Sequence, residues 1–175
     1  MKTSKIIFVT GPISSGKSTV SGLIKNSARL DIDDIYSEHA GGRDFELVYG
    51  DKRFQESCWR DFYEKIRRNR LKNRLVVAQT TGTNPRFNRM VSRLKKEFPN
   101  SVYVIRLDAR KEAILNRTKR RTGRQRRKIS SAMNMYAKIR SSNSKYDFVI
   151  HNDRNLGHLR KKIDEIMNIS HVKYL

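Results

Sequence analysis

The chain has 175 residues and is strongly basic, with 39 Lys and Arg against 17 Asp and Glu. This length predicts one domain that is large enough to bury a hydrophobic core. No run approaches the roughly 18 consecutive apolar residues of a membrane-spanning helix, so we expect no membrane partner. The single cysteine, Cys58, excludes an internal disulfide and fits a reducing, cytoplasmic setting.

The positive charge is concentrated in the later part of the chain. Residues 1–60 hold 9 basic and 8 acidic residues, whereas residues 61–175 hold 30 basic and 9 acidic residues. Such an asymmetry indicates a polyanionic partner or a heavily phosphorylated ligand. A solvated and highly soluble surface has the same composition, so charge alone leaves both interpretations open.

Short apolar runs alternate with longer amphipathic segments along the whole chain. Five runs are predicted to be strands: 5–10, 28–32, 74–80, 101–107 and 146–151. Several of them lack polar alternation, which is typical of parallel strands covered on both faces. Helical patterns lie near 17–26, 54–72, 86–98, 110–121, 129–141 and 155–168. The sequence therefore predicts a single α/β domain of three layers, with a five-stranded parallel sheet between helices.

The stretch "GPISSGKST" matches the P-loop (Walker A) pattern G-x-x-x-x-G-K-[ST]. A predicted strand precedes it and a helical pattern follows, which is the setting this motif requires. The glycines allow backbone N–H groups to converge on phosphate oxygens, Lys17 adds a point charge, and the Ser18 hydroxyl is a ligand for Mg²⁺. The residues expected to hold a nucleoside triphosphate are Gly11, Ser14, Ser15, Gly16, Lys17, Ser18 and Thr19.

The acidic residues near the loop indicate the fate of the bound triphosphate. No guanine-reading Asn-Lys-x-Asp is present, and the third predicted strand ends in "AQTT" without the acid that motor ATPases place there. Three aspartates instead follow the second strand: Asp31, Asp33 and Asp34. Because a strand alternates faces, we expect Asp31 and Asp33 to point alike and Asp34 away. Asp33 is predicted to accept a hydroxyl proton and to hold the metal, although a solvated acidic turn would have the same sequence.

Together these motifs resemble the P-loop kinase superfamily of nucleotide, shikimate and polynucleotide kinases. "GPISSGKST", "DIDD", "VVAQTTGTNPR", "RLDARKEAILNRTKRR" and "YDFVIHND" carry the resemblance over nearly the whole chain. It implies ATP and Mg²⁺ as cofactors and an arginine-rich lid over residues 117–128. Arg117 and Arg121 would share one helix face there and neutralise the transferred phosphoryl group. Asn152, after the fifth strand, would lie against the adenine. A solvated basic helix end is the alternative for the lid.

The resemblance places the phosphate acceptor between the second strand, an insertion over about residues 37–60 and the loop after the third strand. The residues implicated are Asp31, Asp34, Arg43, Arg60, Thr81 and Arg86. Shikimate kinases carry a Phe-Arg pair in the insertion, whereas this chain has Phe54-Gln55, which argues against shikimate. "QTTGTNPRFNR" is closer to the Thr- and Asn-rich segment of polynucleotide-kinase-like enzymes.

The helix expected over residues 54–72 is rich in arginine and would flank the acceptor. Together with the lid it would form a positive trough that favours a polymer such as RNA or DNA at low salt. Three aromatic residues, Trp59, Phe62 and Tyr63, are interleaved at helical spacing and are expected in the core.

The sequence thus predicts an ATP-dependent kinase that phosphorylates a hydroxyl or phosphate of a nucleotide, a nucleoside or a nucleic-acid end. Two alternatives stay open. One is a nucleic-acid-binding P-loop NTPase that hydrolyses nucleotide without an acceptor, and the other is a small-metabolite, shikimate-like kinase.

Overall fold

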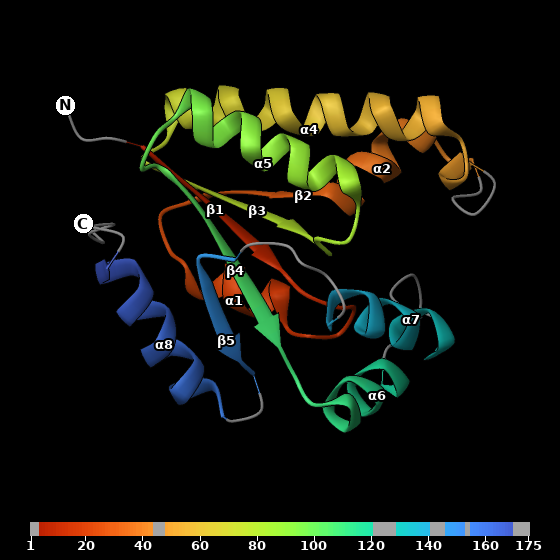
Figure 1. Cartoon of the computed structure of the whole chain (residues 1–175), viewed down its shortest axis with the longest axis vertical. Helices are drawn as coiled ribbons and strands as arrows, with labels where there is room; N and C mark the ends of the chain where they lie inside the picture. The colour runs from red at the N-terminus through yellow and green to blue at the C-terminus, as the bar shows by residue number, and fades with distance from the viewer. Residues whose placement is uncertain (1–3, 44–47, 121–128, 141–145, 153–154, 170–175) are drawn as a thin grey trace.

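A parallel five-stranded sheet forms the centre of the molecule (Figure 1). The computed structural model describes residues 4–43, 48–120, 129–140, 146–152 and 155–169. The strands are β1 (Lys5–Thr10), β2 (Ala28–Asp31), β3 (Leu75–Thr80), β4 (Val102–Asp108) and β5 (Phe148–His151), in the spatial order β2-β3-β1-β4-β5. All four pairings are parallel, which confirms the predicted sheet. Each strand begins and ends within two residues of its expected bounds.

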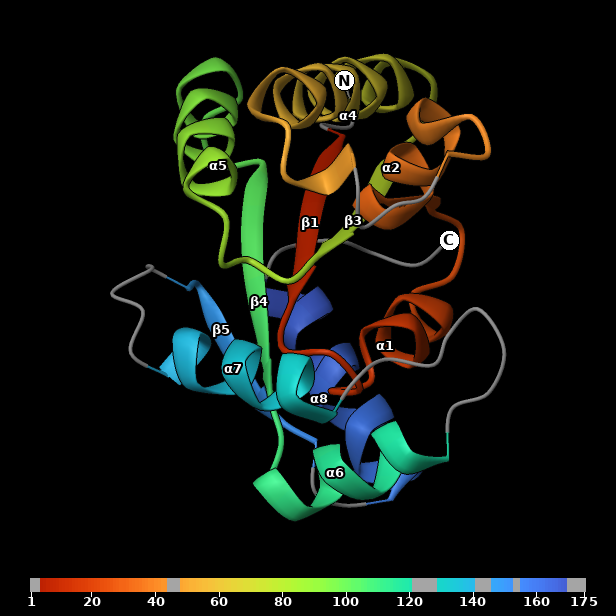
Figure 2. The same cartoon turned by 90° about the vertical axis from the view of Figure 1, so that its right-hand side faces the viewer.

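Helices cover both faces of the sheet. They are α1 (Lys17–Leu23), α2 (Ile32–Ala40), α4 (Lys52–Lys72), α5 (Pro85–Glu97), α6 (Lys111–Lys119), α7 (Ile129–Arg140) and α8 (Leu156–Ile169). Figure 2 shows α2, α4 and α5 on one face, α1 and α8 on the other, and α6 and α7 beyond the carboxyl ends of the strands. The three-layer arrangement is therefore confirmed. Among the described helices, none is both long and apolar enough to cross a membrane.

The alternation of strand side chains divides the core in two. In β1, Ile6 and Phe8 pack in the cluster beneath α4 and α5, whereas Ile7 and Val9 pack in the cluster beneath α1 and α8. Every residue of β3 is buried, as expected for a strand covered on both faces. Trp59, Phe62 and Tyr63 lie in the first cluster at 6%, 0% and 6% exposure, which confirms that they are core residues.

Helix α2 is a correction to the sequence-based expectation, because no helix was expected between residues 26 and 54. β2 ends at Asp31, whose Oδ1 accepts a hydrogen bond from the Asp33 N–H at 3.0 Å and so caps α2. Asp33 and Asp34 therefore lie in the first helical turn, and the prediction that Asp31 and Asp33 share a strand face is wrong. An N-cap aspartate followed by two first-turn acids was the overlooked helix signal.

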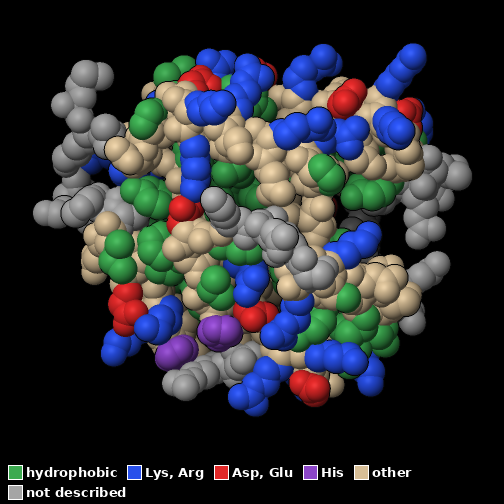
Figure 3. Space-filling model, viewed as in Figure 1, with side chains coloured by type: hydrophobic (Ala, Val, Ile, Leu, Met, Phe, Trp, Pro, Cys, Tyr) green, Lys and Arg blue, Asp and Glu red, His purple; other side chains and the backbone are tan. Residues whose placement is uncertain are grey.

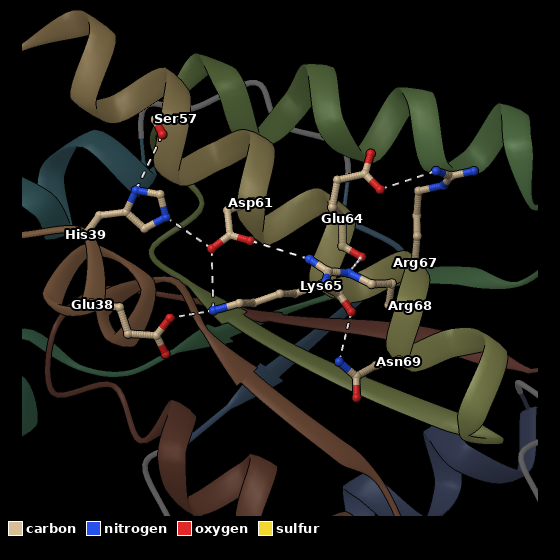
Figure 4. A network of polar contacts seen from close by, with 9 residues as sticks. All are labelled: Glu38, His39, Ser57, Asp61, Glu64, Lys65, Arg67, Arg68 and Asn69. Carbon is tan, nitrogen blue, oxygen red and sulfur yellow. Dashed lines mark hydrogen bonds and ion pairs between the residues drawn. The ribbon is translucent and has the colours of Figure 1, made fainter.

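The C-terminal end of α2 is fastened to α4 by a network of polar contacts (Figure 4). His39 Nε2 lies 3.1 Å from Asp61 Oδ2, and Lys65 pairs with both Asp61 and Glu38. His39 Nδ1 also lies 3.4 Å from the hydroxyl of Ser57. These contacts hold α2 against α4 and thereby position the two aspartates in its first turn.

Candidate active site

The P-loop connects β1 to α1 in a backbone conformation that requires glycine. Gly16 has a φ of 99°, and a Cβ added there would lie 2.3 Å from Nδ2 of Asn152. Ser14 also adopts a positive φ, 64°. Because the first amides of α1 point toward this loop with no acid in the first turn, they are available to an anion.

Polar groups inside the loop fit a phosphate chain. The Ser15 hydroxyl is buried and has no hydrogen-bond partner among the described residues. Lys17 Nζ donates to the carbonyls of Gly11 at 3.1 Å and Pro12 at 3.0 Å, and so lies over the loop. A buried hydroxyl and an ammonium group at one concave backbone form the donor set that phosphate oxygens accept. The loop therefore fits a nucleoside triphosphate, and the exposed Ser18 hydroxyl fits its metal.

Distant parts of the chain support the outer side of the P-loop. Arg117 donates to the carbonyls of Ser14 at 3.4 Å, Ser15 at 3.3 Å and Asn152 at 3.0 Å. Asn152 Nδ2 donates to the Ser15 carbonyl at 2.7 Å, and the Thr118 hydroxyl donates to the Ser14 hydroxyl at 2.9 Å. Arg117 and Asn152 therefore support the P-loop backbone, a role that sequence reasoning did not predict. Their expected contacts with phosphate and adenine stay predictions.

A cavity of about 360 Å³ adjoins the P-loop. Polar residues of the loop form one wall, and two leucines of α8 form another. An apolar wall beside a few oriented polar groups is typical of a site for a base and its sugar. The lining residues are Ser14, Gly16, Lys17, Ser18, Thr19, Arg117, Asn152, Leu156 and Leu159.

Asp31 lies beside the P-loop. It pairs in register with Gln79 of β3, which in turn pairs with Val9 of β1, so the three side chains point to the α1 side of the sheet. Burial raises the pKa of Asp31 to about 6, against an opposing effect of the Lys17 charge. The Gln79 Oε1 is buried and has no hydrogen-bond partner among the described residues. The carboxylate and amide oxygens thus form an acceptor-rich patch next to the lysine.

Asp33 faces a different environment, on the side where the acceptor is expected. Both Asp33 and Asp34 are exposed in the first turn of α2. The pKa of Tyr49 is raised, mainly by burial and further by the Asp33 charge, whereas the Arg86 charge lowers it. Tyr49 is therefore close to Asp33 of α2 and to Arg86 of α5. Sequence reasoning did not identify Tyr49, because its position in the insertion carries no local pattern.

The Arg86 guanidinium is held in place at the start of α5. It donates to Gln55 Oε1 at 3.1 Å and to the Lys52 carbonyl at 3.4 Å, and Asn84 Nδ2 also donates to Gln55 Oε1. The Arg86 Nε is buried and has no hydrogen-bond partner among the described residues. Its one described ion pair, with Glu56, is long at 3.7 Å. Gln55 stands where shikimate kinases carry an arginine. In this chain its side chain instead orients the guanidinium of Arg86.

The remaining predicted acceptor residues are more widely spread. Arg43 donates to the carbonyls of Ala40 and His39 and so caps the far end of α2. Arg60 is exposed on α4, and the Thr81 hydroxyl lies 3.3 Å from that of Thr83 in the loop after β3. Arg121 and the rest of the expected lid from residue 121 to 128 lie outside the described residues.

The order of the strands and the position of the P-loop together identify the fold. A P-loop after the first strand of a parallel sheet ordered β2-β3-β1-β4-β5, with helices on both faces, is the fold of the small P-loop kinases, as the motifs predicted.

Comparisons with solved structures agree with this class. The chain is similar to a sugar kinase from a Janibacter species (TM-score 0.69, 16% identity, covering 98% of this chain and 99% of that one). It is also similar to a gluconokinase from Sinorhizobium meliloti (0.70, 13%, 98% and 96%) and to a shikimate kinase from Acinetobacter baumannii, solved with shikimate (0.60, 17%, 96% and 93%). No protein-family model and no curated protein matches the sequence. At these identities the likeness shows the fold.

Proposed function

We propose that the protein is an ATP- and Mg²⁺-dependent kinase that phosphorylates a hydroxyl group of a small-molecule acceptor. The observation that carries this proposal is the position of Asp33, exposed in the first turn of α2 and bonded through its N–H to Asp31, whose carboxyl is close enough to Lys17 of the P-loop to respond to its charge. The Asp33 charge also raises the pKa of Tyr49, on the side where the acceptor is expected. A hydrolase can also use a carboxylate to activate water, but it has no need for a fixed arginine on the acceptor side. The expected activity is therefore transfer rather than hydrolysis.

The roles of the residues follow from their positions. MgATP, when bound, supplies the phosphoryl group. Lys17, Ser15 and the P-loop amides hold and orient its phosphates. Ser18 would hold the metal together with Asp31, in place of the Asp33 that the sequence favoured, because the carboxyl of Asp31 is close enough to Lys17 to respond to its charge. Asp33, exposed at the start of α2, takes the proton of the acceptor hydroxyl. Arg117 and Asn152 keep the loop rigid, which preserves the alignment on which phosphoryl transfer depends.

Two observations favour a small metabolite as the acceptor. The solved structures with this fold include enzymes named for a sugar, gluconate and shikimate. Arg86 is held by neutral Gln55 and has a single, long ion pair within the described residues, so its charge is available to a carboxylate or phosphate of the acceptor. The nucleotide, nucleoside and nucleic-acid-end acceptors that the sequence favoured stay predictions.

The test is a transfer assay with γ-labelled ATP. The protein is incubated with pools of hydroxylated acids, sugars, nucleosides, nucleotides and 5′-hydroxyl oligonucleotides, and label is followed into each pool and into free phosphate. We expect label in the pool of sugars or hydroxylated acids, abolished by Lys17→Ala and unchanged by Lys25→Ala, an exposed lysine beyond α1. Label in free phosphate alone would favour the NTPase, and label in oligonucleotides would favour the nucleic-acid-end kinase.

A further inference from the structure

The basic residues are unequally divided between the two helical layers. Helices α4 and α5 together carry thirteen basic and four acidic residues, and α2, in the same layer, adds three acidic residues. α1 and α8, on the opposite face of the sheet, carry four basic and two acidic residues. Figure 3 shows the Lys and Arg side chains gathered over α4 and α5, with few acidic side chains among them. Helices α4 and α5 thus carry a net charge of +9, about two fifths of the +22 of the whole chain.

Many of these charges have no acidic partner. Lys65, Arg67 and Lys95 form ion pairs within 3.5 Å, which fix them inside the network between elements. Seven exposed residues of these helices, by contrast, have no carboxylate within ion-pair distance in the described part of the chain. We call them the α4–α5 surface: Lys52, Arg53, Arg60, Lys72, Arg89, Arg93 and Lys96.

The α4–α5 surface has the dimensions of a strip. Helix α4 has 21 residues, which corresponds to about 30 Å. Arg93 of α5 lies 4.4 Å from the centre of the Tyr63 ring of α4, so the two helices contact each other and their charges form one continuous area. α5 begins after the carboxyl end of β3, and α4 ends before the start of that strand. The strip therefore extends from the acceptor side to the opposite edge of the sheet, far beyond the reach of a small acceptor.

We propose that the α4–α5 surface binds the phosphodiester backbone of a nucleic-acid strand. Eight of the thirteen basic residues on these helices are arginines, which bind phosphate through two parallel hydrogen bonds and are weakly hydrated. Closely spaced like charges repel one another, and a polyanion relieves that repulsion while it releases its own counterions. Binding of a strand to the α4–α5 surface does not depend on the proposed kinase site. It can therefore be measured without phosphoryl transfer.

An anionic membrane is the competing polyanion, and the apolar content of the surface disfavours it. Helices that bind membrane interfaces bury several large apolar side chains beside their basic residues. On α4 and α5, Leu71 is the one large hydrophobic residue that is exposed in the described part of the chain, at 82%. The exposed positions Asn88 and Ser92 are polar instead. The surface therefore offers charge and hydrogen bonds with little apolar area.

The experiment measures binding to 20-nucleotide fluorescent RNA and DNA strands of one sequence by anisotropy, without ATP, across a series of KCl concentrations. The test variant combines Lys72→Gln, Arg93→Gln and Lys96→Gln, which lie away from the acceptor side. The matched control combines Lys25→Gln, Arg160→Gln and Lys161→Gln, exposed residues of the opposite layer with the same change in net charge. A charge-retaining variant, Lys72→Arg with Arg93→Lys and Lys96→Arg, reports on the fold.

We expect binding of one or both strands, weakened roughly 10-fold or more in the test variant, with a salt dependence shallower by about 2 in log–log slope. The control and the charge-retaining variant are expected to bind as the native chain does. Equal weakening by test and control would show a non-specific effect of net charge and would overturn the proposal. Binding to phosphatidylserine vesicles with none to either strand would overturn it in favour of a membrane. Transfer to a small acceptor is scored separately, so either proposal can fail alone.

Discussion

The nucleotide side and the acceptor side of the site are built in different ways. On the nucleotide side, Ser14, Ser15, Thr118 and Asn152 are all less than 10% exposed and are joined by hydrogen bonds that include backbone carbonyls. On the acceptor side, Asp33 is exposed, and Arg86 is held by the side chain of Gln55. The first region is a packed part of the fold, whereas the second consists of side chains displayed on its helices.

This difference predicts that the proposed acceptor side can change more readily than the proposed nucleotide side. A change in Ser14 or Asn152 disturbs the P-loop, because the side chain of each makes a buried hydrogen bond there. A change in Asp33 alters an exposed side chain on α2, whose position depends on separate contacts with α4. We therefore expect stability and nucleotide binding to be linked on the first side, and stability and transfer to be separable on the second.

Asp33→Asn is expected to have the largest effect. Loss of the proton acceptor should lower kcat by roughly 10²- to 10⁴-fold, while ATP binding and the melting temperature stay close to native. Steady-state kinetics with the acceptor that the transfer assay labels, together with a thermal-shift titration of ATP, measure both properties. The matched control is Asp164→Asn, an exposed acid on α8, on the opposite face of the sheet. A kcat of the Asp33→Asn variant equal to that of the native chain would show that Asp33 is not the proton acceptor. The proposed difference between the two sides would then fail on the acceptor side.

Asp31 lies between the two sides and makes stability depend on pH. Its folded-state pKa is raised from 3.8 to about 6, so the native state holds the proton more tightly than the unfolded chain. The stabilisation from protonation is complete below about pH 4 and is lost as pH rises through 6. Asparagine also caps helices, so Asp31→Asn should be more stable than the native chain by about 2–3 kcal/mol at pH 7.5, and by little at pH 4.

Denaturant unfolding of both proteins at several pH values measures this difference, with Asp34→Asn as the exposed control. A stability difference that stays constant from pH 4 to 7.5 would show that Asp31 is not shifted. It would also show that Asp31 is solvated, as the exposed Asp33 and Asp34 are.

Asn152→Ala is expected to have the smallest effect of the three, and it affects two properties together. Removal of a buried amide that donates to the Ser15 carbonyl should destabilise the protein by about 1–3 kcal/mol and weaken ATP binding in parallel. Thermal unfolding and ATP titration measure the two changes, with exposed Asn168→Ala as the control. Weaker ATP binding with native stability would instead favour the predicted direct contact between Asn152 and the adenine.

Sequence patterns predicted the elements whose signals are local. The apolar runs predicted all five strands, and the helical patterns predicted every described helix except α2, because hydrophobic periodicity depends on neighbours within a few residues. Helix α2 was missed because "DIDDIY" was interpreted as the end of a strand and a loop, although Asp31 is a strong N-cap. The P-loop was predicted from a motif that specifies both its backbone and its charge.

The sequence by itself thus determined the position of the phosphate-binding loop, the parallel sheet around it and the presence of aspartates after the second strand. Tertiary structure alone decided which face each aspartate serves, that Tyr49 lies near both Asp33 and Arg86, and that Arg117 and Asn152 support the P-loop. The reason is chain separation. The Arg117 and Asn152 contacts join residues more than 100 positions apart, and only the packing of the sheet and its helices brings such residues together.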